Sequence, residues 1–307
     1  MKEPPKERSA YIAIVGRPNV GKSSLMNRLL GQKVAIVSSK PQTTRTRIMG
    51  VLTEGEDQLV FLDTPGLLKP RDRLGEYMVK SVVASVSGVD AALLVVEAGT
   101  KISPADRDLV EQFQKLHLPA VLCINKIDLL PNKTDLMAQI ATLSELYDFD
   151  AVVPASAMDG NGLDDLKQEL KKLCMEGGHL FPDDTLTDQP ERVLAGEIVR
   201  EKLLRLLQKE VPHGLAVVVE QLHEREDHSC VDIGATIYCE KENHKGIIIG
   251  KGGSMLKKVG TYARQDLEKF YGTKVNLQLW VKVKEDWRNK EAALRSFGFN
   301  GDDLLDH

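Results

Sequence analysis

The sequence predicts two α/β units joined by a short linker. The first is a larger N-terminal domain with a doubly wound, mainly parallel sheet, and the second is a smaller C-terminal α+β domain. The chain has 307 residues, a length that suits two domains of ordinary size. Short apolar runs alternate with helical patterns up to about residue 175, which is the order of a parallel sheet with crossover helices. A stretch rich in Gly, Pro, Asp and Thr follows, and such turn residues indicate a domain boundary.

The N-terminal strands are predicted from five short apolar runs, at residues 11–15, 59–62, 91–96, 121–124 and 151–153. Their side chains are nearly all apolar rather than alternating, which is typical of strands buried on both faces. Amphipathic patterns lie between them, for example leucines at three- and four-residue steps across residues 163–173, and these predict helices. We expect this domain to cover residues 1–178.

The C-terminal unit has a different order of elements. After a linker over residues 179–192, we expect a domain over residues 193–307 with the order helix, strand, strand, helix, strand, helix. The first five of these elements are predicted at residues 197–209, 215–221, 231–239, 254–271 and 275–283.

Composition and cysteine usage restrict the class of protein. Hydrophobic residues make up 42% and charged residues 28% of the chain, as in ordinary globular proteins, so extensive disorder is excluded. The four cysteines form no C-x-x-C pair and no Cys/His cluster with zinc spacing, which favours reduced thiols and argues against a structural metal. The first residues are polar, and no apolar run approaches the length of a membrane span. We therefore expect a cytoplasmic protein, with a peripheral membrane contact left open.

A phosphate-binding loop is predicted directly after the first apolar run. Residues 16–23 fit the pattern G-x-x-x-x-G-K-[ST] and stand between a strand and a helix that begins near Lys22. The glycines let the backbone wrap a phosphate, and the helix N-terminus adds N–H donors and positive potential. Lys22 is expected to reach the β- and γ-phosphates, and the Ser23 hydroxyl to bind Mg²⁺. The residues of this candidate loop are Gly16, Arg17, Pro18, Asn19, Val20, Gly21, Lys22, Ser23 and Ser24.

Three further segments follow later apolar runs and concern the γ-phosphate and the base. Asp63 is placed to hold Mg²⁺ through water, and the Gly66 N–H to meet a γ-phosphate. A carboxylate at Asp128 can accept from both the ring N–H and the exocyclic amine of guanine, a donor pair that adenine lacks. Lys126 would pack its stem over the base, and Asn125 would tie its loop to the phosphate loop. The candidate contacts are Asp63, Thr64, Pro65, Gly66 and Leu67, then Asn125, Lys126, Ile127 and Asp128, and finally Ser156 and Ala157.

The order and spacing of these segments predict a guanine-nucleotide site, because each lies at the carboxyl end of a strand, where open α/β sheets bind ligands. The set resembles the translation-factor-related GTPases, in particular the TrmE–Era group. The resemblance implies a P-loop GTPase domain that hydrolyses GTP to GDP and phosphate with Mg²⁺. It assigns catalytic roles to Lys22, Thr44, Asp63 and Gly66, and metal ligation to Ser23, Thr44 and Asp63.

The polar segment 38–47 fits a switch loop that a γ-phosphate and Mg²⁺ would order. The family pattern favours Thr44 as the Mg²⁺ ligand, with Thr43 as the alternative. Leu67 stands where small signalling GTPases carry a glutamine that orients the attacking water, so we expect slow intrinsic hydrolysis or another group in that role. Asn19 matches an asparagine that supports a potassium ion in some relatives. This leads to the hypothesis that K⁺ stimulates GTP turnover.

A second motif, G-x-x-G at residues 250–253, follows an apolar run and opens the helix predicted at residues 254–271. With these neighbours it resembles the loop of a type II K-homology (KH) domain, which clamps the backbone of single-stranded RNA beside an apolar groove for the bases. The missing glycine side chains would let the phosphate backbone approach, and Lys251 supplies charge. The expected RNA contacts are Ile249, Gly250, Lys251, Gly252, Gly253, Lys257, Lys258 and Arg264.

The charge distribution supports an RNA-binding C-terminal unit only when it is read locally. The chain carries 41 Lys and Arg against 45 Asp and Glu, a formal net charge of −4, which by itself argues against a nucleic-acid partner. Residues 245–290, however, contain eleven basic and four acidic side chains, hence a local charge of +7. This basic segment coincides with the G-x-x-G turn, as a phosphate track requires.

The linker and the helix after it also resemble the Era family, so the resemblance covers about residues 9–295. It implies a GTP-dependent factor that binds the 3′ end of 16S ribosomal RNA and assists maturation of the 30S subunit. It further implies a monomer with weak peripheral contact to the inner membrane. Two alternatives stay open. One is a constitutive RNA-binding protein whose nucleotide domain is only structural, and the other is a ribosome-assembly GTPase that acts at another rRNA site.

Overall fold

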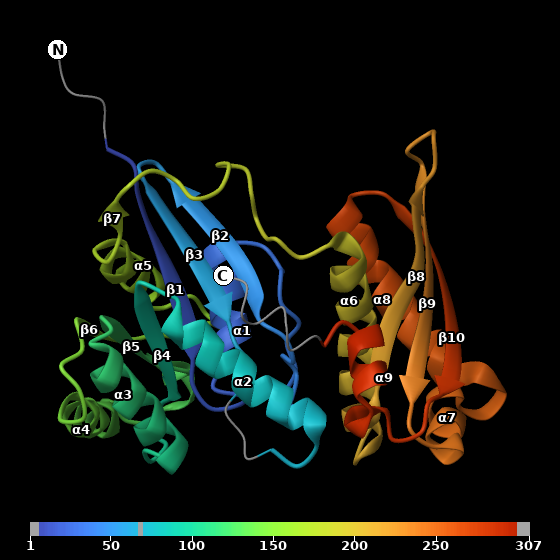
Figure 1. The fold of residues 1–307 in the computed structure, drawn as a ribbon, viewed down its shortest axis with the longest axis horizontal. Coiled ribbons are helices and arrows are strands. Elements are labelled where there is room, and N and C mark those ends of the chain that lie inside the picture. The colour runs from blue at the N-terminus through green and yellow to red at the C-terminus, as the bar shows by residue number, and fades with distance from the viewer. Residues whose placement is uncertain (1–5, 67–69, 300–307) are drawn as a thin grey trace.

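The computed structural model describes residues 6–66 and 70–299 and confirms an α/β protein with two separate sheets (Figure 1). The N-terminal elements are β1 (Arg8–Val15), α1 (Lys22–Leu30), β2 (Ile48–Glu54), β3 (Asp57–Asp63), α2 (Arg73–Ser87), β4 (Ala91–Glu97), α3 (Pro104–Leu116), β5 (Ala120–Asn125), α4 (Lys133–Ser144), β6 (Ala151–Pro154), α5 (Leu163–Lys171) and β7 (Met175–Glu176). Each of the five predicted runs lies in a strand, namely β1, β3, β4, β5 and β6.

The first sheet has the order β2-β3-β1-β4-β5-β6, with β7 paired to β1 off this path. Parallel pairing joins β3, β1, β4, β5 and β6. Two strands were not predicted: β2 is antiparallel to β3, and the short β7 is antiparallel to β1. The turn at Gly55, where φ is 67°, reverses the chain so that β3 runs back along β2. Strand β2 forms an edge of the sheet.

Helices cover both faces of this sheet, which explains why its central strands are almost wholly apolar. Along β1, Ile12 and Ile14 pack on the face covered by α1 and α5, whereas Ala13 and Val15 pack on the face covered by α2 and α3. Successive side chains of a strand point to opposite faces, so both sets are buried. Because β1, β3 and β5 run in the same direction, their carboxyl ends lie at one edge of the sheet.

The C-terminal elements are α6 (Glu191–Leu206), β8 (Ala216–Glu224), β9 (Cys230–Cys239), α7 (Glu242–Ile249), α8 (Ser254–Tyr271), β10 (Lys274–Val283) and α9 (Glu291–Ser296). Their sheet has the order β10-β9-β8, with β8 antiparallel and β10 parallel to β9. The predicted order was wrong in one element, because the apolar run before the G-x-x-G turn ends a helix, α7. Helix α6 also begins earlier than predicted, inside the expected linker.

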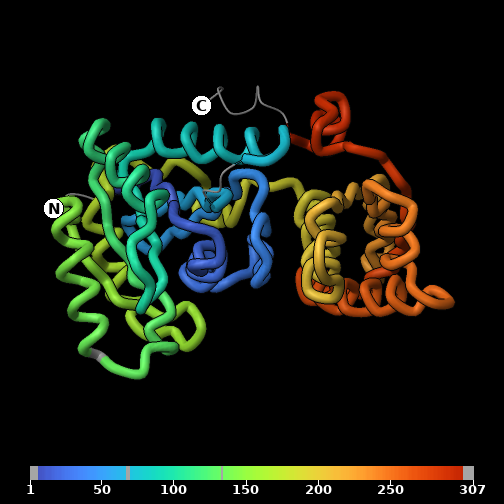
Figure 2. The backbone as a smooth tube through the Cα atoms, turned by 90° about the horizontal axis from the view of Figure 1, so that it is seen from below, coloured from blue at the N-terminus to red at the C-terminus, as the bar shows by residue number. Residues whose placement is uncertain are grey.

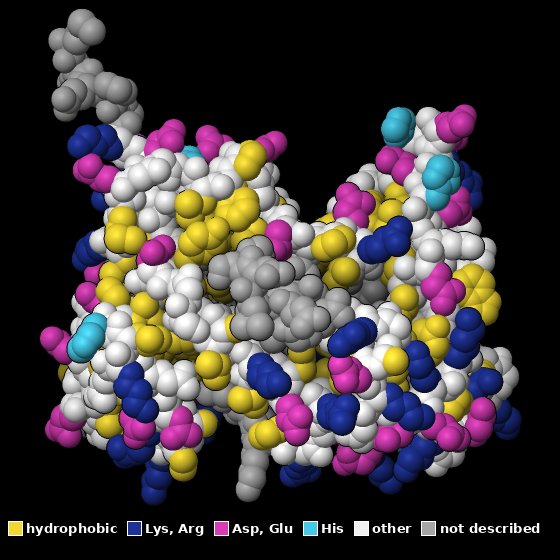
Figure 3. Space-filling view, viewed as in Figure 1, with side chains coloured by type: hydrophobic (Ala, Val, Ile, Leu, Met, Phe, Trp, Pro, Cys, Tyr) yellow, Lys and Arg dark blue, Asp and Glu magenta, His cyan; other side chains and the backbone are white. Residues whose placement is uncertain are grey.

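Helix α6 lies between the two sheets, beside the segment that follows α1 (Figures 1 and 2). Lys and Arg side chains gather on the lower part of the C-terminal unit in Figure 3, interspersed with Asp and Glu. Within the described ranges, none of the helices combines the length and apolarity that crossing a membrane requires.

Candidate nucleotide-binding site and RNA surface

The loop between β1 and α1 closes around the Lys22 side chain. Lys22 is buried, and its Nζ donates to the carbonyl oxygens of Gly16 and Arg17, both at 3.0 Å. An ammonium group has three donors, so one remains for a further acceptor. Burial lowers the Lys22 pKa to about 8, although Asp63 opposes this shift. A buried cation with a free donor at a helix N-terminus suits a phosphate.

Ser23, Thr44 and Asp63 meet beside this lysine. The Ser23 Oγ lies 2.6 Å from Asp63 Oδ2 and 2.9 Å from Thr44 Oγ1, and Thr44 Oγ1 lies 3.3 Å from the same Asp63 oxygen. Burial raises the pKa of Asp63, and its other oxygen, Oδ1, is buried without a hydrogen-bond partner among the described residues. Two hydroxyls and a carboxylate with an unsatisfied oxygen form a donor set that fits Mg²⁺.

The two switch threonines differ in what they contact. Whereas Thr44 joins the cluster, the Thr43 hydroxyl donates to the carbonyl oxygen of Lys40 at 2.6 Å. The Asn19 side chain connects the phosphate loop to the same segment, since its Nδ2 donates to the Ser39 carbonyl oxygen at 2.8 Å. The polar residues after β1 and after α1 therefore face each other across one cavity, which is lined by Asn19, Lys22, Ser23, Thr44, Gly66 and Lys126, among others.

The segment after β3 packs closely on the phosphate loop. The Thr64 hydroxyl donates to the Ile14 carbonyl oxygen at 2.9 Å, so this threonine is buried away from the cavity. A Cβ at Gly66 would lie 2.6 Å from the Pro18 Cα, which leaves room for glycine alone. Leu67, which we predicted to contact the nucleotide, lies outside the described residues.

Asn125 joins three loops at the carboxyl ends of the strands. Its Nδ2 donates to the Val20 carbonyl oxygen at 2.8 Å, and its Oδ1 accepts from the Ala157 N–H at 3.0 Å. Gly21 adopts a φ of 102°, and a Cβ there would lie 2.2 Å from Asn125 Nδ2. Only glycine fits that position, so the second glycine of the loop is explained by its contact with Asn125.

The residues predicted to recognise the base contact neighbouring side chains on both sides. The Asp128 carboxylate accepts from the Ser156 hydroxyl at 2.6 Å, which fixes the orientation of the carboxylate. Lys126 adopts a φ of 66° and its Nζ forms an ion pair with Glu97 at 2.9 Å. The structure thus brings together the predicted segments around Lys126, Asp128 and Ser156, and places them beside the phosphate loop.

The C-terminal unit binds the switch segment through contacts that the sequence analysis missed. The Arg200 guanidinium of α6 donates to the carbonyl oxygen of Thr43, and the Lys40 ammonium donates to that of Leu207. Like Lys40, Arg45 donates from the switch segment to the C-terminal unit, to the carbonyl oxygens of Leu215 at 2.5 Å and His213 at 2.9 Å. Both flanks of Thr44 are therefore attached to the C-terminal unit.

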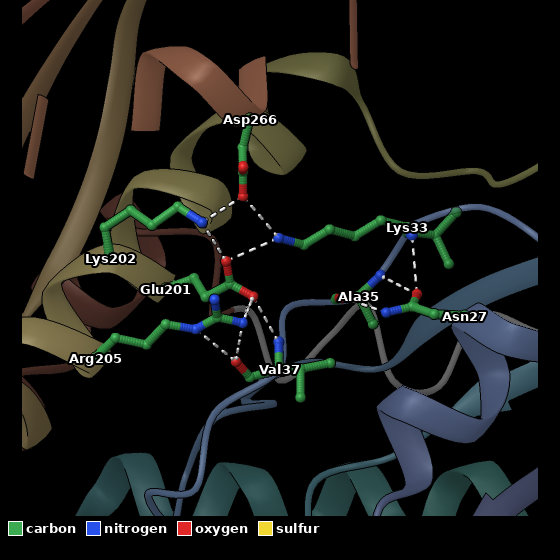
Figure 4. A network of polar contacts seen from close by, with 9 residues as sticks. Asn27, Lys33, Ala35, Val37, Glu201, Lys202, Arg205 and Asp266 are labelled. Carbon is green, nitrogen blue, oxygen red and sulfur yellow. Dashed lines mark hydrogen bonds and ion pairs between the residues drawn. The ribbon is translucent and has the colours of Figure 1, made fainter. Parts of the chain in front are cut away.

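A second group of polar contacts, centred on Glu201, lies directly before the same segment (Figure 4). Glu201 is fully buried, and its Oε1 accepts from the Val37 N–H at 3.0 Å. Its Oε2 contacts Lys33 Nζ at 2.7 Å and Lys202 Nζ at 2.7 Å. Both lysines also pair with Asp266 of α8. A signal for this interface is present in the sequence of α6, where the charged residues Arg200, Glu201 and Lys202 interrupt the apolar pattern and are buried.

The G-x-x-G turn opens a groove between α8 and β10. Gly250 and Gly253 have φ values of 75° and 78°, a backbone conformation in which residues other than glycine are strained. The groove is lined by Gly253, Leu256, Lys257, Gly260, Thr261, Arg264, Leu277 and Leu279. Of the other predicted contacts, Lys251 and Lys258 are exposed and Ile249 is half-buried.

Two family models match separate parts of the chain. The family model described as 50S ribosome-binding GTPase matches residues 11–126, and the KH domain model matches residues 210–288. The curated GTPase Era of Alkaliphilus metalliredigens is 50% identical over 292 residues, with 95% of this chain and 99% of that protein covered. GTPase Era of Clostridioides difficile is 49% identical over 293 residues, with 95% and 99% covered.

Two solved structures have the same architecture. A point variant of Aquifex aeolicus Era bound to GDP·AlF4⁻ superimposes with a TM-score of 0.91 at 41% identity, covering 95% of this chain and 99% of that one. A complex of Era with MgGDPNP and nucleotides 1506–1542 of 16S ribosomal RNA gives a TM-score of 0.91 at 40% identity, with 95% and 99% covered.

The fold and the site together define a P-loop GTPase joined to a C-terminal KH domain. That class and the similarity along nearly the whole chain leave one assignment: the chain belongs to the Era family of GTPases. The predictions of family, fold class and GTPase activity are therefore confirmed.

Proposed function

We propose that this GTPase is a nucleotide-controlled factor that binds the 3′ end of 16S ribosomal RNA through its KH domain and assists maturation of the 30S subunit. The observation that carries the proposal is the attachment of the switch segment to the KH side of the molecule. Thr44 lies between Arg45, which donates to Leu215 and His213, and Thr43, which accepts from Arg200. The solved complex of Era with 16S nucleotides 1506–1542 supports the choice of RNA.

In this proposal, residues 16–24 hold the phosphates, and Asn125, Lys126 and Asp128 recognise guanine. Ser23, Thr44 and Asp63 hold Mg²⁺, which neutralises charge on the β- and γ-phosphates when bound. Lys22 adds its cation beside them, and the backbone of Gly66 meets the γ-phosphate. The contacts of Thr44 with Ser23 and Asp63 support it over Thr43 as the switch ligand.

GTP-dependent ordering of the switch segment would be transmitted to the KH domain through α6, because Arg200 of α6 contacts the segment at Thr43 and Lys202 of α6 pairs with Asp266 of α8. Two states of the segment would then have different RNA affinities, and the coupling is reciprocal. The proposal also includes a cytoplasmic monomer with weak peripheral contact to the inner membrane, and stimulation of turnover by K⁺ near Asn19. Identical turnover in KCl and NaCl at equal ionic strength would remove potassium from it.

The main experiment measures RNA affinity in three nucleotide states: with GDP, with a non-hydrolysable GTP analogue, and without nucleotide. Crosslinking followed by sequencing of the bound RNA identifies the rRNA site in cells. We expect different affinities in the three states and crosslinks at the 3′ end of 16S rRNA. Equal affinities would support a constitutive RNA-binding protein, and crosslinks at another rRNA segment would move the factor to a different assembly step.

A further inference from the structure

Three hollows follow one another around β10, the edge strand of the C-terminal sheet. The first is the KH groove on the α8 side of the strand, and Arg264 lines both this groove and the second hollow. The second hollow lies at the beginning of β10, where Lys274 and Asn276 also line it. Asn276 then lines the third hollow, on the opposite face of the sheet. Shared residues therefore connect the KH groove with the outer face.

The outer face of β10 carries a different set of side chains from the groove. Leu277 and Leu279 pack toward the core beneath α6 and α8. The residues that alternate with them along the strand therefore point outward. One of them, Trp280, remains 44% exposed. The other end of the outer face, at Ala216 and Tyr238, is covered by α9 and by Phe297 directly after it. The exposed indole therefore stands at the edge of the uncovered part.

The third hollow exists because Gly234 has no side chain. A Cβ there would lie 3.2 Å from the Trp280 ring and 3.3 Å from the Gln221 side chain. In the described part of the chain, the side-chain amides of Gln221 and Gln278 make no hydrogen bonds, although both line the hollow. Asp232 also lines it and is held in place by Arg225, at 2.7 and 2.9 Å. The hollow thus offers free amides and a fixed carboxylate beside an aromatic ring.

This combination matches a nucleobase better than an apolar peptide. An exposed aromatic ring stacks on a base of any sequence, and amide or carboxylate groups pair with base edges. Lys274 and Lys282 lie on β10 at either side of this hollow and are exposed, as phosphate contacts require. Lys282 has an exposed partner, Glu220 at 3.9 Å, and a surface pair of this kind is weak. An apolar protein partner would instead require apolar neighbours around Trp280, and Gln278, Thr236 and Lys282 occupy those positions in the ladder.

We propose that Gly234, Gln278 and Trp280 form a nucleobase site on the outer face of the KH sheet. Single-stranded RNA leaving the G-x-x-G groove would pass Arg264 and Lys274 at the end of β10 and place a base on Trp280. The inference rests on the proposed function, in that it assumes RNA in the KH groove, and it assigns a second contact surface to that RNA.

Tryptophan fluorescence tests this directly, since the chain contains two tryptophans and Trp287 is fully buried. The probe is RNA of 16S nucleotides 1506–1542, titrated into the full-length protein with a GTP analogue. We expect RNA to quench the Trp280 emission. Trp280→Phe, which keeps a ring for stacking, should lose the quenching and retain the affinity, whereas Trp280→Ala should weaken binding by about tenfold.

Two further variants separate the two surfaces. Gly234→Leu fills the hollow and should weaken RNA binding as Trp280→Ala does, with GTP turnover and circular dichroism unchanged. If Gly234→Leu fails to fold, Trp280→Ala carries the test alone. Leu116→Ala, which removes a 49% exposed side chain of α3, is the matched surface control.

The outcomes distinguish the inference from the function on which it rests. Normal RNA binding with no quenching, and with full affinity in Trp280→Ala, would overturn the outer-face site and leave the proposed function intact. If the wild-type protein does not bind this RNA, the proposed function fails and the inference fails with it. Quenching that disappears in Trp280→Phe, together with the affinity loss in Trp280→Ala, supports both.

Discussion

Glu201 of α6 accepts a hydrogen bond from the backbone N–H of Val37, with Oε1 and N 3.0 Å apart, across the boundary between the GTPase and KH sides of the molecule. Burial opposes ionisation of this carboxylate, but hydrogen bonds from Lys202, Lys33 and the Val37 N–H hold its pKa below the ordinary value. A buried charge with several charge-assisted partners stabilises one geometry strongly. The position of the switch segment is thereby set in part by the KH side.

Replacing Glu201 with alanine should loosen this attachment. The variant leaves the buried Lys202 with Asp266 as its remaining partner, and removing one member of a buried ion pair costs about 3 kcal/mol. Urea unfolding should show a loss of that order. The ratio of RNA affinities with a GTP analogue and with GDP should move toward one. Glu111→Gln, an exposed position on α3, serves as the control, and an unchanged affinity ratio in Glu201→Ala would show that α6 does not transmit the nucleotide state.

The two switch threonines should respond differently to alanine substitution. Thr44→Ala removes a hydroxyl 2.9 Å from Ser23 and 3.3 Å from Asp63, so we expect the Mg²⁺ concentration for half-maximal turnover to rise by about tenfold or more, one lost charge-assisted contact being worth about 1.5–3 kcal/mol. Thr43→Ala removes only the bond to the Lys40 carbonyl oxygen and should leave this requirement unchanged. The reverse result would assign the metal to Thr43.

Replacing the Asp128 carboxylate with an amide should change which base the site selects. An asparagine presents one acceptor and one donor, which suits xanthine, with a ring N–H and a carbonyl at the corresponding positions, better than guanine. Asp128→Asn should therefore lose GTP affinity by roughly 100-fold, since two charge-assisted hydrogen bonds are affected, and gain affinity for xanthosine triphosphate. Competition binding with both nucleotides measures the change. Ser156→Ala, which removes the bond that orients the carboxylate, should weaken GTP without altering this preference.

A negative charge in the G-x-x-G turn should block RNA and spare GTP hydrolysis. Gly253→Asp places a carboxylate where the phosphate backbone would approach, in a backbone conformation with φ of 78°. Gly253→Asn is the matched control, because asparagine has the same size and tolerates this conformation better than most residues. RNA binding should fall far more in the aspartate variant. Equal losses in the two would indicate that shape rather than charge governs the turn.

Acidification should weaken the contact between the two sides of the molecule at His213. Burial lowers the pKa of this imidazole and the neighbouring Arg45 and Lys40 cations add to the effect, whereas Glu210 opposes it. The unfolded chain takes up the proton near pH 6.5, and the folded chain takes it up only at lower pH. The free energy of unfolding is therefore unaffected by this group above about pH 6.5 and decreases as the pH falls below that value. Urea unfolding at pH 7.5 and 5.5 should show a smaller pH dependence in His213→Asn than in the wild-type protein. An identical dependence in both would remove His213 as the source.

Much of the nucleotide site could be predicted from local sequence because its parts are short and lie at the ends of strands. The glycines of residues 16–23 mark the loop directly, and Asn125 reaches this loop from the end of β5, which is separated from β1 by β4 alone. The basic segment around the G-x-x-G turn was likewise visible once charge was counted locally. It was less uniform than the count indicated, since Arg288 is bound to Asp72 and Glu240 rather than free for RNA.

The sequence by itself determined the fold class, the family, the nucleotide motifs and the KH turn, since each depends on neighbouring residues and on alternation along a strand or helix. Only the tertiary structure showed how Thr44 rather than Thr43 meets Ser23, and how Arg200, Glu201 and Arg45 join the two sides. Thr44 reaches Ser23 through its hydroxyl, but only the folded loop decides which of two adjacent threonines does so. The contacts of Arg200, Glu201 and Arg45 use backbone groups as partners, namely those of Thr43, Val37 and Leu215. Every residue carries those groups, so a sequence pattern cannot specify which of them a distant side chain will reach.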